Sequence, residues 1–240
     1  MAFVDRRDAG RRLAALVSAA LRAREPGGGG PVPGPVVEGM ARGGVPVAFE
    51  VARALGAPLD VVVVRKLGHP DQPELGLGAI AEGGVRLVNA ALVHRLGVTA
   101  QTIDAVAARE LAELERRLQR YRGGRPPMPV GGTTVVVVDD GIATGFTARA
   151  AVDVMRARGA SRVVLAVPVG PPTTLASLAD VADEVVCVEA TDRFSGIGEW
   201  YRDFHQVGDD EVAALLADAA GGRPGPAPAG AGGDDGGGRG

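Results

Sequence analysis

The stretch "VVVVDDGIATGFT", Val135–Thr147, decides the fold. It opens with four valines, a β-branched apolar run that is typical of a strand buried on both faces. Asp139 and Asp140 follow directly, and the small-residue loop 141–147 then leads into a helical pattern. Two adjacent carboxylates at the end of a buried strand are costly without polar partners. The stretch therefore favours a strand end that faces a ligand over a plain structural turn.

Similar apolar runs alternate with helical patterns along the rest of the chain. Strands are expected near Val36, Val61, Val135, Val163 and Val185, and helices over 5–23, 45–56, 102–122, from the loop to about 159, 173–179 and 209–219. The second strand is expected to span Leu59–Lys66. This alternation predicts an α/β fold with a doubly wound, mainly parallel five-stranded sheet covered on both faces. The run 77–89 adds an edge hairpin that turns at Gly83 and Gly84.

The composition bounds the domain and its setting. The chain has 240 residues, 46% of them apolar, which suits one domain over 1–220 followed by a disordered Gly- and Pro-rich tail at 221–240. The run Glu25–Pro35 is expected to be a linker or loop. An amphipathic first helix and the lack of a membrane-length apolar segment predict a cytoplasmic protein without a membrane partner. The net charge of −3 shows no basic excess, which argues against a nucleic-acid partner.

Other kinds of site lack their motifs. Cys187 is the single cysteine and lies in an apolar run, which favours a small buried side chain over a nucleophile. No Cys/His cluster has zinc spacing, and no Gly-Lys-Ser/Thr follows a glycine-rich loop. The adjacent acids also differ from the spaced Asp-x-Asp of hydrolases that use an aspartyl nucleophile. The acid pair and its loop are therefore the candidate site.

Ligands bind beyond the carboxyl ends of parallel strands, so three segments should meet on one rim. These are the segment 38–44 after the first strand, Arg65 and Lys66 after the second, and the loop 141–147 after the third. The loop amides and the helix N-terminus are suited to a phosphate, and Thr144 and Thr147 add hydroxyl donors. Arg42 and Lys66 can hold a larger anion. A sugar with a phosphate at one end and a polyphosphate at the other would provide a binding partner for every group on this rim, with its diol beside the carboxylates.

Two motifs on this rim resemble those of a known family. "VVVVDDGIATG" resembles the phosphoribosyl diphosphate signature of type I phosphoribosyltransferases, and "ARGG", Ala41–Gly44, resembles their pyrophosphate loop. The resemblance spans roughly 36–207. The segments "DRRDAGRRLA", "RKLGHPDQPELGLGAI" and "YRGGRPP" resemble an uncharacterised phosphoribosyltransferase-like subgroup. The resemblance implies binding of 5-phosphoribosyl 1-diphosphate (PRPP) with Mg²⁺ and transfer of the phosphoribosyl group to a nitrogenous base, with release of pyrophosphate.

The resemblance also implies a role for each part of the rim. Asp139 and Asp140 would be the catalytic acids, orienting the diol, favouring an oxocarbenium-like transition state and contacting Mg²⁺ only through ribose hydroxyls or water. The 5′-phosphate would bind Gly141, Ile142, Ala143, Thr144, Gly145 and Thr147. The pyrophosphate would bind Arg42, Gly43, Gly44, Lys66 and Arg202. A non-proline cis peptide bond between Ala41 and Arg42 is implied as well.

A hood after the last strand is implied to cover the base. The segment Thr191–Val207 gathers the single Trp, one of two Tyr and two of five Phe residues. Trp200 and Tyr201, with Phe204 as a third candidate, could stack on a base, although an aromatic cluster that closes a small core is the alternative. Ala143 stands where hypoxanthine–guanine enzymes carry an aspartate, and in this the chain is similar to adenine-type enzymes.

Several points stay open at this stage. The fold also serves non-catalytic PRPP-sensing regulators, and another reaction on a phosphorylated ribose is possible. A homodimer is possible too. The segment "YRGGRPP", Tyr121–Pro127, has the Gly and Arg composition of a mobile loop. Because paired acids repel each other, Asp140→Asn is expected to leave the stability of the ligand-free protein unchanged or raised.

Overall fold

The computed structural model describes residues 2–23 and 34–221. The linker expected at 25–35 lies outside the described residues except for its last two positions. The tail expected at 221–240 lies outside them except for Gly221, which ends the last helix. The expected domain limits of 1–220 stay a prediction.

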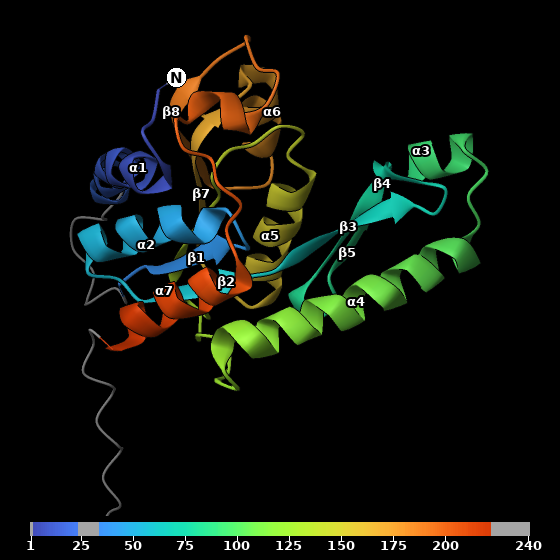
Figure 1. Ribbon diagram of the computed structural model, residues 1–240, viewed down its shortest axis with the longest axis horizontal. Helices are drawn as coiled ribbons and strands as arrows, with labels where there is room; N and C mark the ends of the chain where they lie inside the picture. The colour runs from blue at the N-terminus through green and yellow to red at the C-terminus, as the bar shows by residue number, and fades with distance from the viewer. Residues whose placement is uncertain (1, 24–33, 222–240) are drawn as a thin grey trace, which may run out of the picture.

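A parallel five-stranded sheet forms the centre of the molecule (Figure 1). Its strands lie in the order β2-β1-β6-β7-β8 and comprise β2 Leu59–Val62, β1 Val36–Met40, β6 Thr134–Val138, β7 Arg162–Gly170 and β8 Glu184–Ala190. Every neighbouring pair is parallel. The predicted doubly wound α/β fold is therefore confirmed, and the valine runs form its central strands.

Both faces of this sheet are covered by helices. Alternate strand residues point to opposite faces, so Val135 and Val137 pack with α5 (Phe146–Ala157), whereas Val136 packs on the other face. The helices on that other face are α1 Arg6–Arg22 and α2 Gly44–Leu55. The remaining helices of the main body are α6 Pro172–Leu178 and α7 Asp209–Gly221, and a short 3-10 helix, η2, covers Ile197–Trp200. The fully apolar strands are explained by this double cover.

An arm leaves the main sheet between β2 and β6. It comprises β3 Val64–His69, β4 Gln72–Ala81, the 3-10 helix η1 Glu82–Gly84, β5 Arg86–Val88, α3 Ala90–Arg95 and α4 Ala100–Arg122. Figure 1 shows its strands and α3 projecting to one side of the main sheet. The turn at Gly83 and Gly84 is confirmed, and both glycines have a positive φ. The predicted place of the hairpin at the edge of the main sheet is wrong, because it belongs to a separate three-stranded antiparallel sheet.

The arm corrects one predicted strand. The second strand does not run from Leu59 to Lys66, because β2 ends at Val62 and β3 pairs with β4 instead of β1. The run of four valines at 61–64 contains no turn residue, so the sequence carries no signal for the change of sheet. The short helix α3 was not predicted either.

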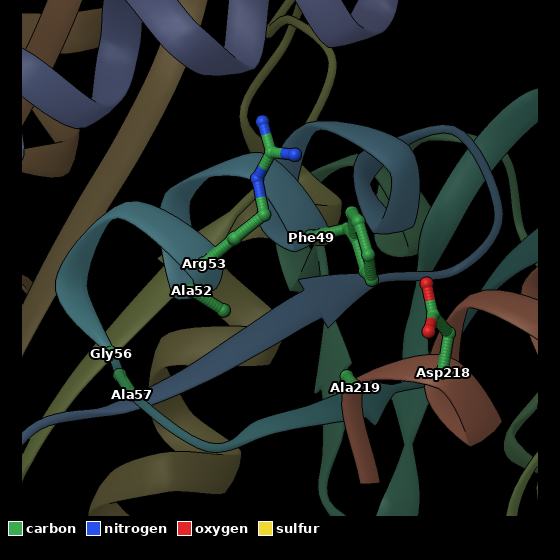
Figure 2. A pocket seen from close by; sticks show the side chains of 7 residues that line it. All are labelled: Phe49, Ala52, Arg53, Gly56, Ala57, Asp218 and Ala219. Carbon is green, nitrogen blue, oxygen red and sulfur yellow. The ribbon is translucent and has the colours of Figure 1, made fainter. Parts of the chain in front are cut away.

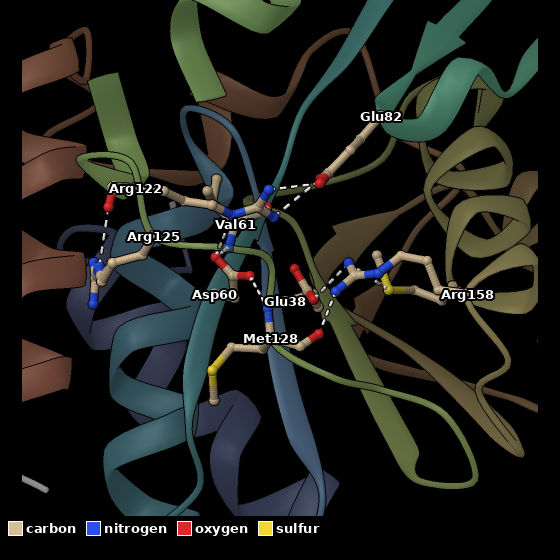
Figure 3. Close-up of polar contacts among 9 residues, drawn as sticks. Glu38, Asp60, Val61, Glu82, Arg122, Arg125, Met128 and Arg158 are labelled. Atoms are coloured by element: carbon tan, nitrogen blue, oxygen red, sulfur yellow. Dashed lines mark hydrogen bonds and ion pairs between the residues drawn. The ribbon is translucent and has the colours of Figure 1, made fainter. Parts of the chain in front are cut away.

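A buried polar network fastens the base of the arm to the main sheet (Figure 3). Glu38 and Asp60 are neighbours in the β1–β2 register. Arg122, the last residue of α4, donates from Nε to Asp60 at 3.0 Å and from its Nη atoms to Glu82 and to the carbonyl oxygen of Val61. The start of "YRGGRPP" is therefore an anchor at Arg122, which is buried, and a mobile loop in this segment stays a prediction.

The same network includes Arg158, which contacts Glu38 on the neighbouring strand β1. Arg158 Nη1 donates to Oε1 of Glu38 at 3.0 Å, and Arg158 also donates to the carbonyl oxygen of Met128. Oε2 of Glu38 is buried without a hydrogen-bond partner among the described residues. Burial, with the charge of Asp60, raises the pKa of Glu38 to about 8. This carboxyl is therefore a source of pH-dependent stability.

Candidate functional site

The acid pair lies beside the loop that follows β1. β1 and β6 are neighbours, so their carboxyl ends bring Arg42 and Gly43 next to Asp139 and Asp140. A Cβ atom on Gly43 would collide with the carboxylate of Asp140, and one on Gly44 would lie 2.5 Å from the carbonyl oxygen of Val138. Glycine is required at both positions by this close approach. The two motifs meet on one edge of the sheet, as predicted.

The peptide bond between Ala41 and Arg42 is cis, as predicted. The loop is held at both ends by backbone hydrogen bonds. The N–H of Ala41 donates to Val62 at 3.0 Å, and the carbonyl oxygen of Arg42 accepts from Val45 at 3.1 Å. The loop thus joins β1 directly to the first turn of α2.

Arg6, on the first helix, is the partner of Asp140. Its Nε donates to Oδ2 of Asp140 at 2.8 Å, and its Nη1 donates to the carbonyl oxygen of His205 at 2.8 Å. Its guanidinium carbon lies 3.9 Å from the centroid of the Phe204 ring. The Arg6 and Asp140 side chains are only 8% and 11% exposed. Arg6 was not among the predicted site residues.

Both acids of the pair have raised pKa values. Burial raises the pKa of Asp139 well above its usual range, and the charge of Asp140 raises it further. Burial also raises the pKa of Asp140, although the Arg6 guanidinium opposes this shift. The backbone N–H of Asp140 donates to Oδ1 of Asp139 at 2.9 Å. The pair therefore binds protons at higher pH than ordinary aspartates do.

The loop after the acid pair presents open backbone amides. Gly145 has a φ of 77° and stands at the N-cap of α5, where no side chain caps the helix. Within the described ranges, the N–H groups of Ala143, Thr144 and Gly145 have no hydrogen-bond acceptor. Thr144 and Thr147 are exposed. This arrangement can receive an anion, since unpaired amides at a helix N-terminus favour negative charge.

Two other members of the loop face inward. Ile142 is buried, and its N–H donates to Val169 at 2.9 Å. A Cβ atom on Gly141 would lie 2.7 Å from the side chain of Ile197 in the hood. Gly141 therefore permits close packing of the hood on the acid pair, and Ile142 anchors the loop to β7.

A cleft of about 370 Å³ opens between Asp140, the β1 loop and the hood. Its lining comprises Arg6, Arg42, Gly43, Asp140, Phe204, His205, Gln206 and Val207. The Arg42 side chain is partly exposed, and its Nη1 lies 3.6 Å from Oδ1 of Asp209, the first residue of α7. Two guanidinium groups therefore face one cleft next to a carboxylate.

The hood aromatics form a small core. Tyr201 is 2% exposed, and its ring centroid lies 5.3 Å from that of Phe3 and 5.0 Å from that of Phe204. Its hydroxyl donates to the carbonyl oxygen of Asp140 at 2.6 Å. Trp200 is partly buried against the same cluster. This matches the core alternative, and of these rings it is Phe204, 37% exposed, that lines the cleft.

Two predicted pyrophosphate residues lie elsewhere. Lys66 is on β3, in the arm, with its side chain over Gly76 of β4. Arg202 is exposed, and its N–H donates to the carbonyl oxygen of Phe3 at 3.0 Å. Neither lines the cleft, and their contact with a ligand stays a prediction.

A second hollow, of about 330 Å³, lies between α2 and α7 (Figure 2). It is lined by Phe49, Ala52, Arg53, Gly56, Ala57, Asp218 and Ala219. Because α2 runs back from the carboxyl edge of the sheet, Gly56 at its end stands beside the start of β2, at the opposite edge. None of the predicted site residues lines this hollow.

The donor set suits a metal ion that a substrate completes. In the part of the chain that the structure describes, no group of three or more His, Cys, Asp or Glu side chains could hold a metal ion. Mg²⁺ usually keeps several waters and is completed by substrate oxygens, and Asp139 and Asp140 beside an anion site fit this use through water or substrate hydroxyls.

No helix in residues 2–23 and 34–221 is long and apolar enough to cross a membrane.

Comparison with known proteins finds a matching family model and similar chains. Residues 8–203 match the model of the phosphoribosyl transferase domain. A Mycobacterium tuberculosis H37Rv protein named "Putative phosphoribosyl transferase Rv0571c" is 52% identical over 214 residues, which cover 89% of this chain and 46% of that protein. The chain thus spans about half the length of the curated relatives it matches. The crystal structure of TT1426 from Thermus thermophilus is 41% identical, with a TM-score of 0.74 over 91% of this chain and 99% of that chain.

Proposed function

Because the chain belongs to the phosphoribosyl transferase family, we propose that it binds PRPP and transfers the phosphoribosyl group to a nitrogenous base, releasing pyrophosphate. The juxtaposition of Asp140 with Gly43 is the observation that carries the proposal. It supports one continuous ligand that spans the acid pair, the open amide loop and the arginine-lined cleft. We further propose that this reaction serves nucleotide metabolism in the cytoplasm.

Each part of the site has a proposed task. Asp139 and Asp140 accept hydrogen bonds from the ribose hydroxyls, and their negative charge stabilises the positive charge that develops on the sugar ring. The amides of the loop 143–145, with the hydroxyls of Thr144 and Thr147, bind the 5′-phosphate. Arg42 donates to the leaving pyrophosphate, a task that suits the fork of a guanidinium. Mg²⁺ held by the acids through ribose hydroxyls or water would supply further positive charge beside the pyrophosphate.

The base is proposed to bind under the hood. Phe204 supports this, because its ring is the aromatic surface that borders the cleft. Ala143 provides no side-chain acid at its position on the loop. The protein must therefore take its proton acceptor for the incoming nitrogen from elsewhere or use a base that needs none.

Calorimetry with PRPP and Mg²⁺, followed by a pyrophosphate-release assay over a panel of purine and pyrimidine bases, tests the proposal. We expect binding, and turnover with at least one base. Asp139→Asn should lower kcat/KM by about 100- to 1,000-fold, since it removes a charge that acts in the transition state. Asp180→Asn is the matched control, because Asp180 is exposed, follows the end of α6 and has no hydrogen bond or ion pair in the described chain.

The outcomes separate the alternatives. Binding of PRPP without turnover on any base would support a sensor instead of an enzyme. Pyrophosphate release that needs no base would indicate another reaction on the phosphorylated ribose. A wild-type protein that binds neither PRPP nor ribose 5-phosphate would overturn the proposal.

A further inference from the structure

Arg6 touches three parts of the cleft at once. It joins the Asp140 carboxylate, the backbone of His205 and the ring of Phe204, although it lies 134 positions before Asp140 in the chain. Its Nη2 atom has no hydrogen bond to any described residue, and Arg6 lines the cleft. α1 therefore contributes a side chain to the lining of the candidate site.

The contacts use properties that are specific to arginine. One planar guanidinium donates in two directions, to a carboxylate and to a carbonyl oxygen, while its face lies over an aromatic ring. A lysine ammonium could keep the charge but could not make this set of contacts. Because a buried charge without a partner is costly, Arg6 and Asp140 depend on each other.

Asp140 is surrounded by groups of both signs. Asp139 lies beside it at the end of β6, and Arg42 lies across the cleft on the β1 loop. From the hood, Tyr201 donates to the carbonyl oxygen of Asp140, and His205 lines the cleft. Arg6 alone among these makes an ion pair with the Asp140 carboxylate in the described structure. Burial raises the pKa of Asp140, and Arg6 is the main group that opposes this.

We propose that Arg6 is a positioning residue for the phosphoribosyl site, which fixes the Asp140 carboxylate against Gly43 and ties the hood to the acid pair. The identity of the ligand rests on the proposed function. The contact itself does not, and it can be tested in the ligand-free protein.

The first test is NMR spectroscopy of the full-length protein without ligand. Arg6→Gln should shift the resonances of the Phe204 ring and of the His205 backbone, because the guanidinium that lies on this ring and donates to the His205 carbonyl oxygen is lost. Arg7→Gln is the matched control: Arg7 is the next residue, exposed, and without a hydrogen bond or ion pair to any described residue. It should leave these resonances unchanged, whereas unchanged Phe204 and His205 resonances in Arg6→Gln would overturn the proposal.

The second test is a double-mutant cycle on PRPP affinity at pH 7 in the presence of Mg²⁺. Arg6→Gln and Asp140→Asn should each weaken binding, and the double variant should bind about as weakly as Asp140→Asn, because Arg6 is proposed to act through Asp140. Arg6→Lys should keep a deficit, since it cannot hold His205 and Phe204 together. Deficits that add in full in the double variant would show that Arg6 does not act through Asp140 and would contradict the proposal.

Two further outcomes remain decisive. If the wild-type protein binds no PRPP, the proposed function fails, and the resonances of Phe204 and His205 still decide the role of Arg6. If Arg6→Gln does not fold, the wild-type protein provides the test. The Nε–H proton of Arg6 should then exchange slowly with solvent and show nuclear Overhauser contacts to the Phe204 ring, and a rapidly exchanging Nε–H without these contacts would overturn the inference.

Discussion

Gly43 and Asp140 pack so closely that a methyl group on Gly43 would occupy the place of the Asp140 carboxylate. Gly43 has a φ of −61° and a ψ of −32°, a conformation that alanine adopts freely. Glycine is therefore required at position 43 for steric reasons and not for its backbone conformation.

Gly43→Ala should displace the Asp140 carboxylate, weaken its contact with Arg6 and abolish most of the PRPP affinity. Gly131→Ala is the control, because the nearest atom to a Cβ there is 4.0 Å away. Calorimetry on both variants checks the prediction. Wild-type affinity in Gly43→Ala would show that the acid does not need this position.

Asp140→Asn is now expected to lower the free energy of unfolding. The two adjacent acids alone suggested unchanged or raised stability, but the structure adds Arg6, whose buried charge would lose its counter-charge. The expected loss is about 1–3 kcal/mol, since the amide can still accept one hydrogen bond. Urea unfolding at pH 7, with Asp180→Asn as the control, measures it. An unchanged or higher stability would restore the simpler expectation of two repelling acids.

The pH dependence of kcat/KM should reflect the protonation of Asp139 and Asp140. The pKa values of both acids are raised above the usual aspartate value of about 3.9. As the pH falls, the acids therefore lose their negative charge at a higher pH than ordinary aspartates do. Activity should fall as the pH decreases through this higher range. Dividing the kcat/KM of the wild type by that of Asp139→Asn at each pH removes the effect of the titration of the substrate phosphate. A ratio that does not change with pH would contradict the role of the acid pair.

Glu38 should make the protein less stable as the pH rises. Its pKa is about 8 in the folded protein and about 4.5 in an ordinary environment, so the folded state binds the proton more tightly. The contribution of this proton to the free energy of unfolding is then fully present below about pH 4.5. It is lost as the pH rises towards about 8, by about 1.4 kcal/mol for each unit of the pKa shift.

Glu38→Gln removes this titration and keeps an acceptor for Arg158. The variant should match the wild type at pH 4.5 and exceed its free energy of unfolding at pH 8.5. Urea unfolding at the two pH values provides the comparison, with Glu115→Gln, at an exposed position of α4, as the control. A variant that is less stable than the wild type at pH 8.5 would show that the Glu38–Arg158 ion pair outweighs burial.

The parts of the site that the sequence predicts correctly have local signals. The buried strands that end just before Asp139 and Asp140, and just before the Arg42 and Gly43 loop, place both segments on one edge, because parallel strands share their direction. Arg6 has no such signal, since its partner is 134 positions away and only the packing of α1 brings them together. The change of sheet after Val62 was missed for the opposite reason: the local pattern continues although the hydrogen-bond partners change.

The hood shows a further limit of sequence patterns. The gathering of aromatic residues around Tyr201 indicates a special segment but does not tell a ligand-binding ring from a core ring. The hydrogen bond from Tyr201 to Asp140, together with the packing on Phe3, decides this for Tyr201. Phe204, on the same short segment, remains partly exposed.

The most direct test of the central claim is a crystal structure of the full-length protein with PRPP and Mg²⁺. The account predicts the 5′-phosphate on the amides of the loop 143–145, the ribose hydroxyls on Asp139 and Asp140, and the pyrophosphate beside Arg42 in the cleft. Clear density for PRPP at another place, such as the hollow between α2 and α7, with no ligand at the acid pair, would contradict it.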